Sequence, residues 1–269
     1  MPRTGRPTTF AALQDKDFLV QKYVHEKLST VKIAQVVGCD AKLVNYRLRQ
    51  FGILTRNFGE SHRIDPFKFI GNNNVLYGSL LGDGSLLMKN RGGQGWASFS
   101  KSNINYDHVF FVGRKLLAGG DPTTHIDAWK PKLGRTAFRF KTRVCEEFLK
   151  EHIRWYPEKK IVPADLKLNR EIILHWFLDD GHSSWRNAKK TRIAVGFSTE
   201  SFTKEDCEYL CGEFKKFDCD AYLQKSHGGY GYKIFLRANS HEKFFDLMGS
   251  CPPEISSMQY KWKLPWVKT

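Results

Sequence analysis

The chain contains two apolar runs that end in Asp-Gly: ILHWFLDDG at residues 173–181 and LYGSLLGDG at residues 76–84. Asp180 and Asp83 hold matching places in these runs, at an offset of 180 − 83 = 97 residues. Each run has the length and composition of a buried helix, and a glycine after the last apolar turn is a signal for a helix end. A single Asp-Gly most often marks only a turn. Two of them, each after an apolar helix and at matching positions, favour a duplicated functional site.

Other landmarks recur at nearly the same offset. Phe99-Ser100 corresponds to Phe197-Ser198 at 98 residues, and Phe148 corresponds to Phe244 at 96 residues. Constant spacing over most of a half is the mark of an internal repeat. The chain after about residue 65 therefore reads as a diverged duplication.

Both halves predict the same order: an apolar helix ending in Asp-Gly, two strands, a helix, two strands and a helix. In the first half the expected elements after the Asp-Gly helix are strands 85–89 and 96–101, helix 103–117, strands 125–130 and 136–141, and helix 144–155. In the second half they are strands 183–186 and 192–198, helix 203–217, strands 221–225 and 232–237, and helix 242–248. The predicted fold class is α+β, a pseudo-symmetric duplicated αββαββα core whose two antiparallel sheets form a saddle fitted to a duplex.

The chain is strongly basic. Its 43 Lys+Arg exceed 28 Asp+Glu by 15, and the excess is spread along the whole sequence. A structured polyanion is the expected partner, although charge alone does not separate DNA from RNA, from an anionic membrane or from simple solubility. Strand alternation places Phe138 and Phe140 on one face and Arg139 and Lys141 on the other. The residues expected to contact DNA in this core are Lys89, Arg91, Lys101, Arg139, Lys141, Arg186, Arg192, Lys225, Lys233 and Arg237.

Cysteines and apolar runs exclude several other classes. Six cysteines occur without a CxxC pair, so neither a zinc site nor a disulfide framework is predicted. No run approaches the ~18 apolar residues of a membrane span, and the N-terminus lacks the apolar core of a signal peptide. We therefore expect a soluble intracellular protein that does not bind membranes, located in the cytoplasm of a bacterium or phage-infected cell or in an organelle.

Residues 15–53 predict three short helices. Ser29 or Thr30 can cap the second helix, Gly38 makes a turn, and Asp40 can cap a third helix over 41–51. This arrangement is typical of a helix-turn-helix whose last helix enters a major groove; a small spacer with a merely solvated basic face is the alternative. The outward residues expected to read DNA are Lys42, Asn45, Arg47 and Arg49. The predicted domains are 1–56 for a basic arm and this module, 57–72 for a linker, 73–165 for the first half and 166–269 for the second.

A carboxylate at each helix end suggests a metal. The carboxyl end of a helix carries partial negative charge, so an aspartate there is unfavourable unless a cation binds. A hard divalent ion, with Mg²⁺ the expected one, would relieve that repulsion. Gly78, Ser79 and Gly82 have the spacing that lets a neighbouring helix approach closely. His175 and Trp176 hold the matching places in the second helix, so the packing should be asymmetric.

Taken together, the second motif at 176–181 and the stretches 156–163, 197–202 and 258–261 resemble a single-chain, two-motif LAGLIDADG homing endonuclease over about residues 65–269. The resemblance implies that Asp83 and Asp180 are the metal-binding catalytic acids of a site with two or three Mg²⁺ ions. Gly82 and Asp179 would offer backbone carbonyls to those ions. It further implies that Lys160 and Lys261 are basic active-site residues, with an ordinary phosphate contact or solvated charge as the alternative. Ser226 or His227 would be a polar residue near the site.

The function implied by this resemblance is an endodeoxyribonuclease. It would make a double-strand break in a long asymmetric DNA target by Mg²⁺-dependent hydrolysis, leaving 3′ overhangs, and would act as a monomer without a protein partner in intron homing. The alternative is a catalytically inactive nucleic-acid-binding protein of the same fold, either an intron RNA maturase or a DNA-binding regulator. An intein-resident nuclease is disfavoured because the chain starts at Met1 and shows no splicing-junction residues.

Overall fold

The computed structural model describes residues 11–53, 55, 73–91, 94–117, 120–130, 135–186, 189 and 192–262. The chain divides into two compact units, Met1–His62 and Arg63–Thr269. The predicted basic arm and the predicted linker 57–72 lie outside the described residues, so the finer domain boundaries remain predictions.

The N-terminal unit is a small helical domain with its own apolar cluster, which includes Ile33, Val44 and Leu48. Ser29 caps α2 by accepting from Lys32 N, and Asp40 caps α3 by accepting from Lys42 N. These contacts satisfy amide groups that a helix start otherwise leaves unpaired. The elements are η1 (Ala11–Leu13), α1 (Lys16–Leu19), η2 (Val20–His25), α2 (Thr30–Val37) and α3 (Ala41–Gln50).

The second unit consists of two halves of the same design. The first half comprises α6 (Asn73–Leu81), β1 (Ser85–Arg91), β2 (Gln94–Asn103), α7 (Tyr106–Leu116), η3 (Thr123–His125), β3 (Ile126–Trp129), β4 (Ala137–Lys141) and α8 (Glu146–Trp155). The second half comprises α9 (Arg170–Asp180), β5 (Gly181–Trp185), β6 (Ile193–Phe197), α10 (Lys204–Phe214), η4 (Lys215–Phe217), β7 (Ala221–Lys225), β8 (Tyr232–Leu236), η5 (Ala238–Ser240), α11 (His241–Met248) and η6 (Pro253–Trp262).

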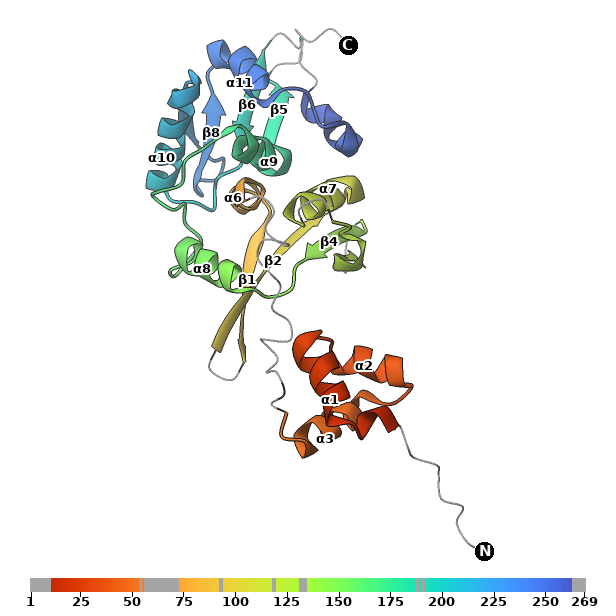
Figure 1. Ribbon diagram of the computed structural model, residues 1–269. Coiled ribbons are helices and arrows are strands. Elements are labelled where there is room, and N and C mark those ends of the chain that lie inside the picture. Colours follow the sequence, from red (N-terminus) through yellow and green to blue (C-terminus); the bar gives the residue numbers. More distant parts are fainter. Residues whose placement is uncertain are drawn as a thin grey trace, which may run out of the picture. The chain divides into compact units, whose positions relative to one another are not determined.

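The two four-stranded antiparallel sheets have matching topologies, with strand orders β1-β2-β4-β3 and β5-β6-β8-β7. The predicted α+β class with its duplicated core is therefore confirmed. Figure 1 shows α6 and α9 side by side between the two sheets. One local difference concerns β5, which begins at Gly181 rather than at residue 183 because Gly181 is already extended (φ −72°, ψ 147°). The helix α9 therefore passes directly into the strand.

A single apolar cluster extends through both halves. The ring of Trp176 stacks on Phe197 with centroids 4.0 Å apart, and Phe177 meets Phe244 edge to face. Burying aromatic side chains of this size contributes a large part of the stability of a core. The helix α9 is thus anchored by aromatic packing within its own half.

A polar link joins the C-terminal segment to the first half. Asp107, at the start of α7, accepts from Ser257 Oγ at 2.6 Å and from Ser257 N at 3.0 Å. Ser257 belongs to η6, the same segment that carries Lys261. The position of Lys261 therefore depends on both halves.

Candidate active site

The site lies where α6 and α9 approach each other most closely. A Cβ atom on Gly78 would lie 2.6 Å from His175 Cβ and 2.6 Å from the Ile172 carbonyl oxygen, closer than real Cβ contacts allow. On Gly82, a Cβ would lie 2.8 Å from Asp179 Oδ2. The two glycines therefore permit a contact that any side chain would block, as the sequence predicted. His175 supplies the bulk on the opposite helix, so the packing is asymmetric.

Asp83 and Asp180 are at equivalent helix ends but in different surroundings. Asp83 is exposed in the turn after α6, whereas Asp180 is the last residue of α9 and is only partly exposed. Burial, together with the negative charges of Asp83 and Asp179, raises the pKa of Asp180 to about 7. The two carboxylates thus act on each other electrostatically, and the site favours a compensating cation.

Lys160 approaches the first helix end. Its Nζ donates to the carbonyl oxygens of Gly82 at 3.2 Å and Gly84 at 3.1 Å, which flank Asp83. Burial lowers the pKa of Lys160 to about 8, although Asp180, Asp179 and Asp83 oppose the change. A lysine ammonium has three N–H donors. One donor of Lys160 therefore remains beyond these two contacts.

Lys261 approaches the second helix end but is bonded differently. Its Nζ donates to the carbonyl oxygens of Phe177, Leu178 and Asp179 at 2.9, 2.8 and 2.9 Å. These contacts use all three donors, and they satisfy the Leu178 and Asp179 carbonyls at the helix end, while the Phe177 carbonyl also accepts from Gly181 N. Burial lowers the pKa of Lys261 to about 8 as well. In this arrangement Lys261 is a cap for α9.

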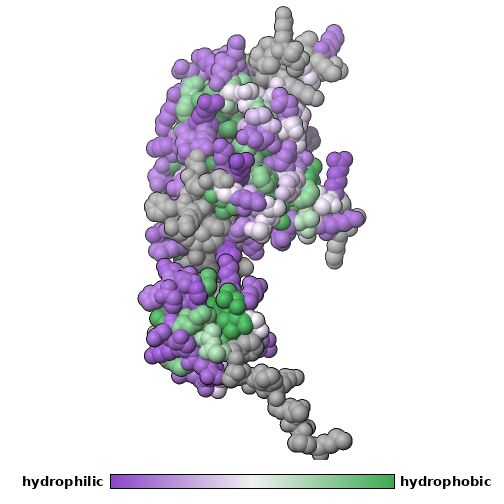
Figure 2. All heavy atoms as spheres, turned by 45° about the vertical axis from the view of Figure 1, so that its right-hand side comes forward, coloured by the Kyte–Doolittle hydropathy of each residue, from purple (hydrophilic) through white to green (hydrophobic). Residues whose placement is uncertain are grey.

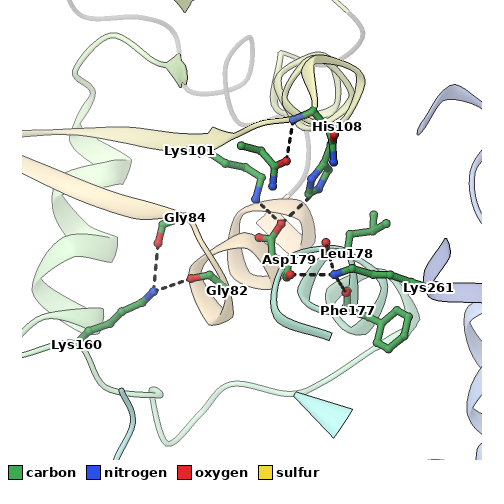
Figure 3. A network of polar contacts seen from close by, with 11 residues as sticks. Gly82, Gly84, Lys101, His108, Lys160, Phe177, Leu178, Asp179 and Lys261 are labelled. Atoms are coloured by element: carbon green, nitrogen blue, oxygen red, sulfur yellow. Dashed lines mark hydrogen bonds and ion pairs between the residues drawn. The ribbon is translucent and has the colours of Figure 1, made fainter. Parts of the chain in front are cut away.

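Behind the second helix end lies a buried polar cluster (Figure 3). Lys101 Nζ, from β2 of the first half, donates to Asp179 Oδ1, and both side chains have no exposed surface. His108 Nε2 from α7 lies 3.3 Å from the same carboxylate oxygen. Burial, reinforced by the positive charges of Lys101 and Lys261 and by His175, lowers the pKa of His108 well below its usual range. His108 is therefore neutral in the cluster.

Lys101 is thus a correction to the sequence analysis, which expected it on a DNA-facing surface. Strand alternation in fact puts Lys101 on the same face of β2 as Ala97 and Phe99, which belong to the apolar core. Residues 96–101 are all buried, and both α7 and α8 contact this strand. The pairing of Lys101 with the doubled aspartate of the second motif was also missed, because partners 78 residues apart carry no local signal.

The oxygen donors fit a divalent cation whose coordination is completed by substrate. Among the described residues, no group of three or more His, Cys, Asp or Glu side chains could hold a metal ion. Asp83 and Asp180 nevertheless offer carboxylate oxygens at one place, and Mg²⁺ is commonly bound by one or two carboxylates together with phosphate oxygens and water. The Asp179 side chain turns toward Lys101, and the carbonyls of Gly82 and Asp179 accept from lysines. Asp83 and Asp180 are therefore the residues that fit a metal best.

The other residues predicted to contact DNA have varied surroundings. Lys42, Arg49, Arg186, Arg192, Lys225 and Arg237 are exposed, while Asn45, Arg47, Arg139, Lys141 and Lys233 are partly buried. Asn45 donates to the Ala41 carbonyl, and Lys233 pairs with Glu200 at 3.0 Å. Lys89 and Arg91 belong to β1, but their side chains lie outside the described residues. On the face seen in Figure 2, hydrophilic side chains dominate the surface.

Ser226 and His227 lie in the turn between β7 and β8. Ser226 Oγ contacts Glu200 at 3.4 Å. Among the described contacts, none joins either residue to the two helix ends. Their assignment to the site remains a prediction.

Comparisons with known proteins agree with this geometry. The LAGLIDADG DNA endonuclease family matches residues 73–244. The fold resembles that of the homing endonuclease I-WcaI bound to its DNA recognition sequence, with a TM-score of 0.57 and 22% identity, over 82% of this chain and 92% of that chain. No helix within the described residues meets the length and apolarity that a membrane crossing requires.

Curated relatives include proteins with different names. An uncharacterised protein of Methanocaldococcus jannaschii, MJ1098, is 23% identical over 92% of this chain and 99% of its own length, a coverage greater than the C-terminal unit alone can supply. A cytochrome b mRNA maturase bI2 of Debaryomyces hansenii is 24% identical over 70% of this chain and 71% of its own. A probable intron-encoded endonuclease of Wickerhamomyces canadensis is 27% identical over 70% of this chain and 81% of its own.

Proposed function

The chain belongs to the LAGLIDADG DNA endonuclease family, and we propose that it is a site-specific homing endonuclease making a double-strand break in a long asymmetric DNA target. One observation carries the proposal. Asp83 and Asp180 lie at the ends of two helices packed through Gly78 and Gly82, and each helix end is contacted by a lysine. Two half-sites in one chain suit a monomer that cuts both strands, leaving 3′ overhangs.

In this proposal each aspartate serves hydrolysis of one phosphodiester. Asp83 and Asp180 bind divalent metal, with Mg²⁺ the expected ion, and bound metal would polarise the phosphate and favour deprotonation of the attacking water. Lys160, which keeps one donor beyond its carbonyl contacts, stabilises negative charge that develops on the phosphate. Lys261 keeps the last turn of α9 in place so that Asp180 presents its carboxylate.

The N-terminal unit would extend the contacts with DNA as a helix-turn-helix. Gly38 has a left-handed conformation (φ 76°) between α2 and α3, which allows the tight turn. The side chains of Lys42 and Arg49 are exposed on α3, and Tyr46 between them is 55% exposed. A helix with this surface offers donors and an apolar ring to base edges or phosphates.

A cleavage selection tests the enzyme proposal. Purified protein is incubated with a random DNA library in Mg²⁺, and the cleaved molecules are sequenced. We expect one long asymmetric consensus, cut on both strands, with no product in EDTA. The matched control is the double variant Asp83→Asn/Asp180→Asn, which should bind the selected target and leave it intact. Equal cutting by this variant would assign the activity to a contaminant or another site.

Variants of α3 in the full chain test the role of the N-terminal unit. Arg49→Ala should weaken binding to the selected target by about tenfold or more, since an arginine contact to a base or phosphate contributes ~1–3 kcal/mol. Lys16→Ala, an exposed lysine on α1, removes the same charge from another part of the unit and serves as the control. Equal affinities for the two variants would favour the solvated spacer.

A second candidate function is RNA maturation without DNA cleavage, because curated relatives include cytochrome b mRNA maturases. The presence of both aspartates and both lysines favours the endonuclease. The selection above separates the two: a chain that binds structured RNA tightly, yet cuts no DNA in Mg²⁺, would be a maturase.

A further inference from the structure

The side chain of Lys101, a residue of the first half, pairs with a carboxylate of the second half. Its Nζ donates to the carboxylate of Asp179, and neither side chain has any exposed surface. The same cluster contains His108, whose Nε2 lies 3.3 Å from Asp179 Oδ1. The free-energy cost of removing two charges from water offsets much of the attraction between them. A buried ion pair therefore adds little net stability, and stability alone does not explain this one.

Asp179 is held at two points. Its side chain is held by Lys101, and its carbonyl oxygen accepts from Lys261 Nζ at 2.9 Å. The next residue is Asp180. Asp179, which immediately precedes Asp180, is therefore fixed at both its side chain and its backbone. The two lysines that hold it come from different segments of the chain (Figure 3).

The first helix end has no such clamp within the described residues. Gly82 stands at the place of Asp179 and has no side chain, and a Cβ there would lie 2.8 Å from Asp179 Oδ2. The repeat offset of 98 residues places Thr199 opposite Lys101, and the Thr199 hydroxyl donates to the Tyr232 carbonyl at 2.7 Å inside its own half. The cross-half contact therefore serves only one of the two centres.

We propose that Lys101 is a positioning residue for the Asp180 centre: by holding Asp179 from the opposite half, it orients Asp180 and governs cleavage of one DNA strand. This inference rests on the proposed endonuclease function. It makes hydrolysis at the second centre depend on the first half, whereas the Asp83 centre does not depend on Lys101.

The test follows each strand separately on the selected target duplex in Mg²⁺. The strand cut at the Asp180 centre is first identified as the one that Asp180→Asn leaves intact. In Lys101→Met, we expect the rate on that strand to fall on the order of tenfold or more relative to the other strand, because small displacements of a reacting group have large effects on rate. Products should then accumulate as nicked duplex. Lys167→Met, which removes a surface lysine that is 67% exposed, should keep the wild-type ratio.

Two further variants separate positioning from stability. Lys101→Met/Asp179→Asn leaves no unpaired charge in the cluster, so it should fold and recover the melting temperature while retaining the altered strand ratio. Asp179→Asn alone keeps an oxygen that can accept from Lys101. Its strand ratio should therefore stay close to that of the wild type. Equal slowing of both strands in Lys101→Met, or a wild-type ratio in the double variant, would overturn the inference. If the wild-type protein cuts neither strand, the proposed function itself is wrong.

Discussion

The two helix ends carry the same chemistry on different supports. After α6 the chain turns sharply, with Gly82 N and Gly84 N both donating to the Ser79 carbonyl at 3.1 and 2.7 Å. After α9 the chain continues straight into β5, and Lys261 donates to the carbonyls of Leu178 and Asp179 and shares that of Phe177 with Gly181 N. The duplicated aspartates thus have matching positions, while the residues that hold them have diverged. Aspartates at equivalent positions therefore need not respond equally to change.

The largest expected effect comes from the aspartates. Asp83→Asn should stop cleavage of one strand and Asp180→Asn that of the other, each by on the order of a thousandfold, while DNA binding persists. The measurement is the rate of nicking of each labelled strand. Comparable double-strand cutting by either variant would break the assignment of one centre to one strand.

The next largest difference is expected between substitutions of the two lysines. Lys160→Met should slow the strand served by Asp83 by roughly a hundredfold and should lower the melting temperature less than Lys261→Met does, because Lys160 is partly exposed and donates to two carbonyls, not three. Lys261→Met should also lower the free energy of unfolding, by roughly 2 kcal/mol or more, because the Leu178 and Asp179 carbonyls at the end of α9 lose the lysine donor. Strand-resolved kinetics and thermal unfolding check both expectations. Identical behaviour of the two variants would show that the bonding difference has no energetic consequence.

Stability against pH should distinguish Asp180 from Asp83. The pKa of Asp180 is raised to about 7, so between about pH 4 and pH 7 the folded protein retains a proton that the unfolded chain loses. This group therefore lowers stability as pH rises through that window. Buried histidines with a lowered pKa instead raise stability as pH rises. The measurement is therefore the difference in stability between a variant and the wild type at each pH.

In EDTA, the melting temperature of Asp180→Asn minus that of the wild type should grow from pH 4 to pH 7, by about 3 °C or more. Asp83→Asn removes one of the charges that raise the pKa of Asp180, so its difference from the wild type should grow in the same direction but by less. A constant difference for Asp180→Asn would show that its carboxylate is not strained by burial.

The smallest effect concerns the contact between the helix ends. Gly82→Ala should lower the free energy of unfolding by about 1–3 kcal/mol, because its Cβ would meet the Asp179 carboxylate at 2.8 Å. Gly212→Ala in α10 has open space around the added methyl and should instead be stabilising by about 0.5–1 kcal/mol. Denaturant unfolding measures both. Equal effects would mean that the helices can separate at no cost.

Much of the architecture could be predicted from local pattern. The repeat offset and the alternating strands predicted both halves, because each element's periodicity reflects its own burial. Ser29, Gly38 and Asp40 predicted the ends of α2 and α3, since capping is a local interaction. Gly78 and Gly82 predicted the close helix contact because small residues at this spacing leave room for a neighbouring helix.

What could not be predicted depends on contacts distant in sequence. Lys101 was expected on an open strand face, but it shares the core face of β2 with Phe99, and its partner Asp179 comes from the other half. His108 gave only a weak signal, a polar residue among apolar neighbours on α7. Lys160 and Lys261 contact different carbonyls because the segments that carry them approach the two helix ends differently, and this approach has no local signal in the sequence.

The link between Asp107 and Ser257 limits how the protein can be recombined. A chimera that joins the first half of this chain to the second half of a relative would break that link unless both partners were carried over together. The segment bearing Lys261 would then lose its anchor on α7, even with every catalytic residue retained. Designs that exchange halves should therefore treat residues 107 and 257 as one inherited unit.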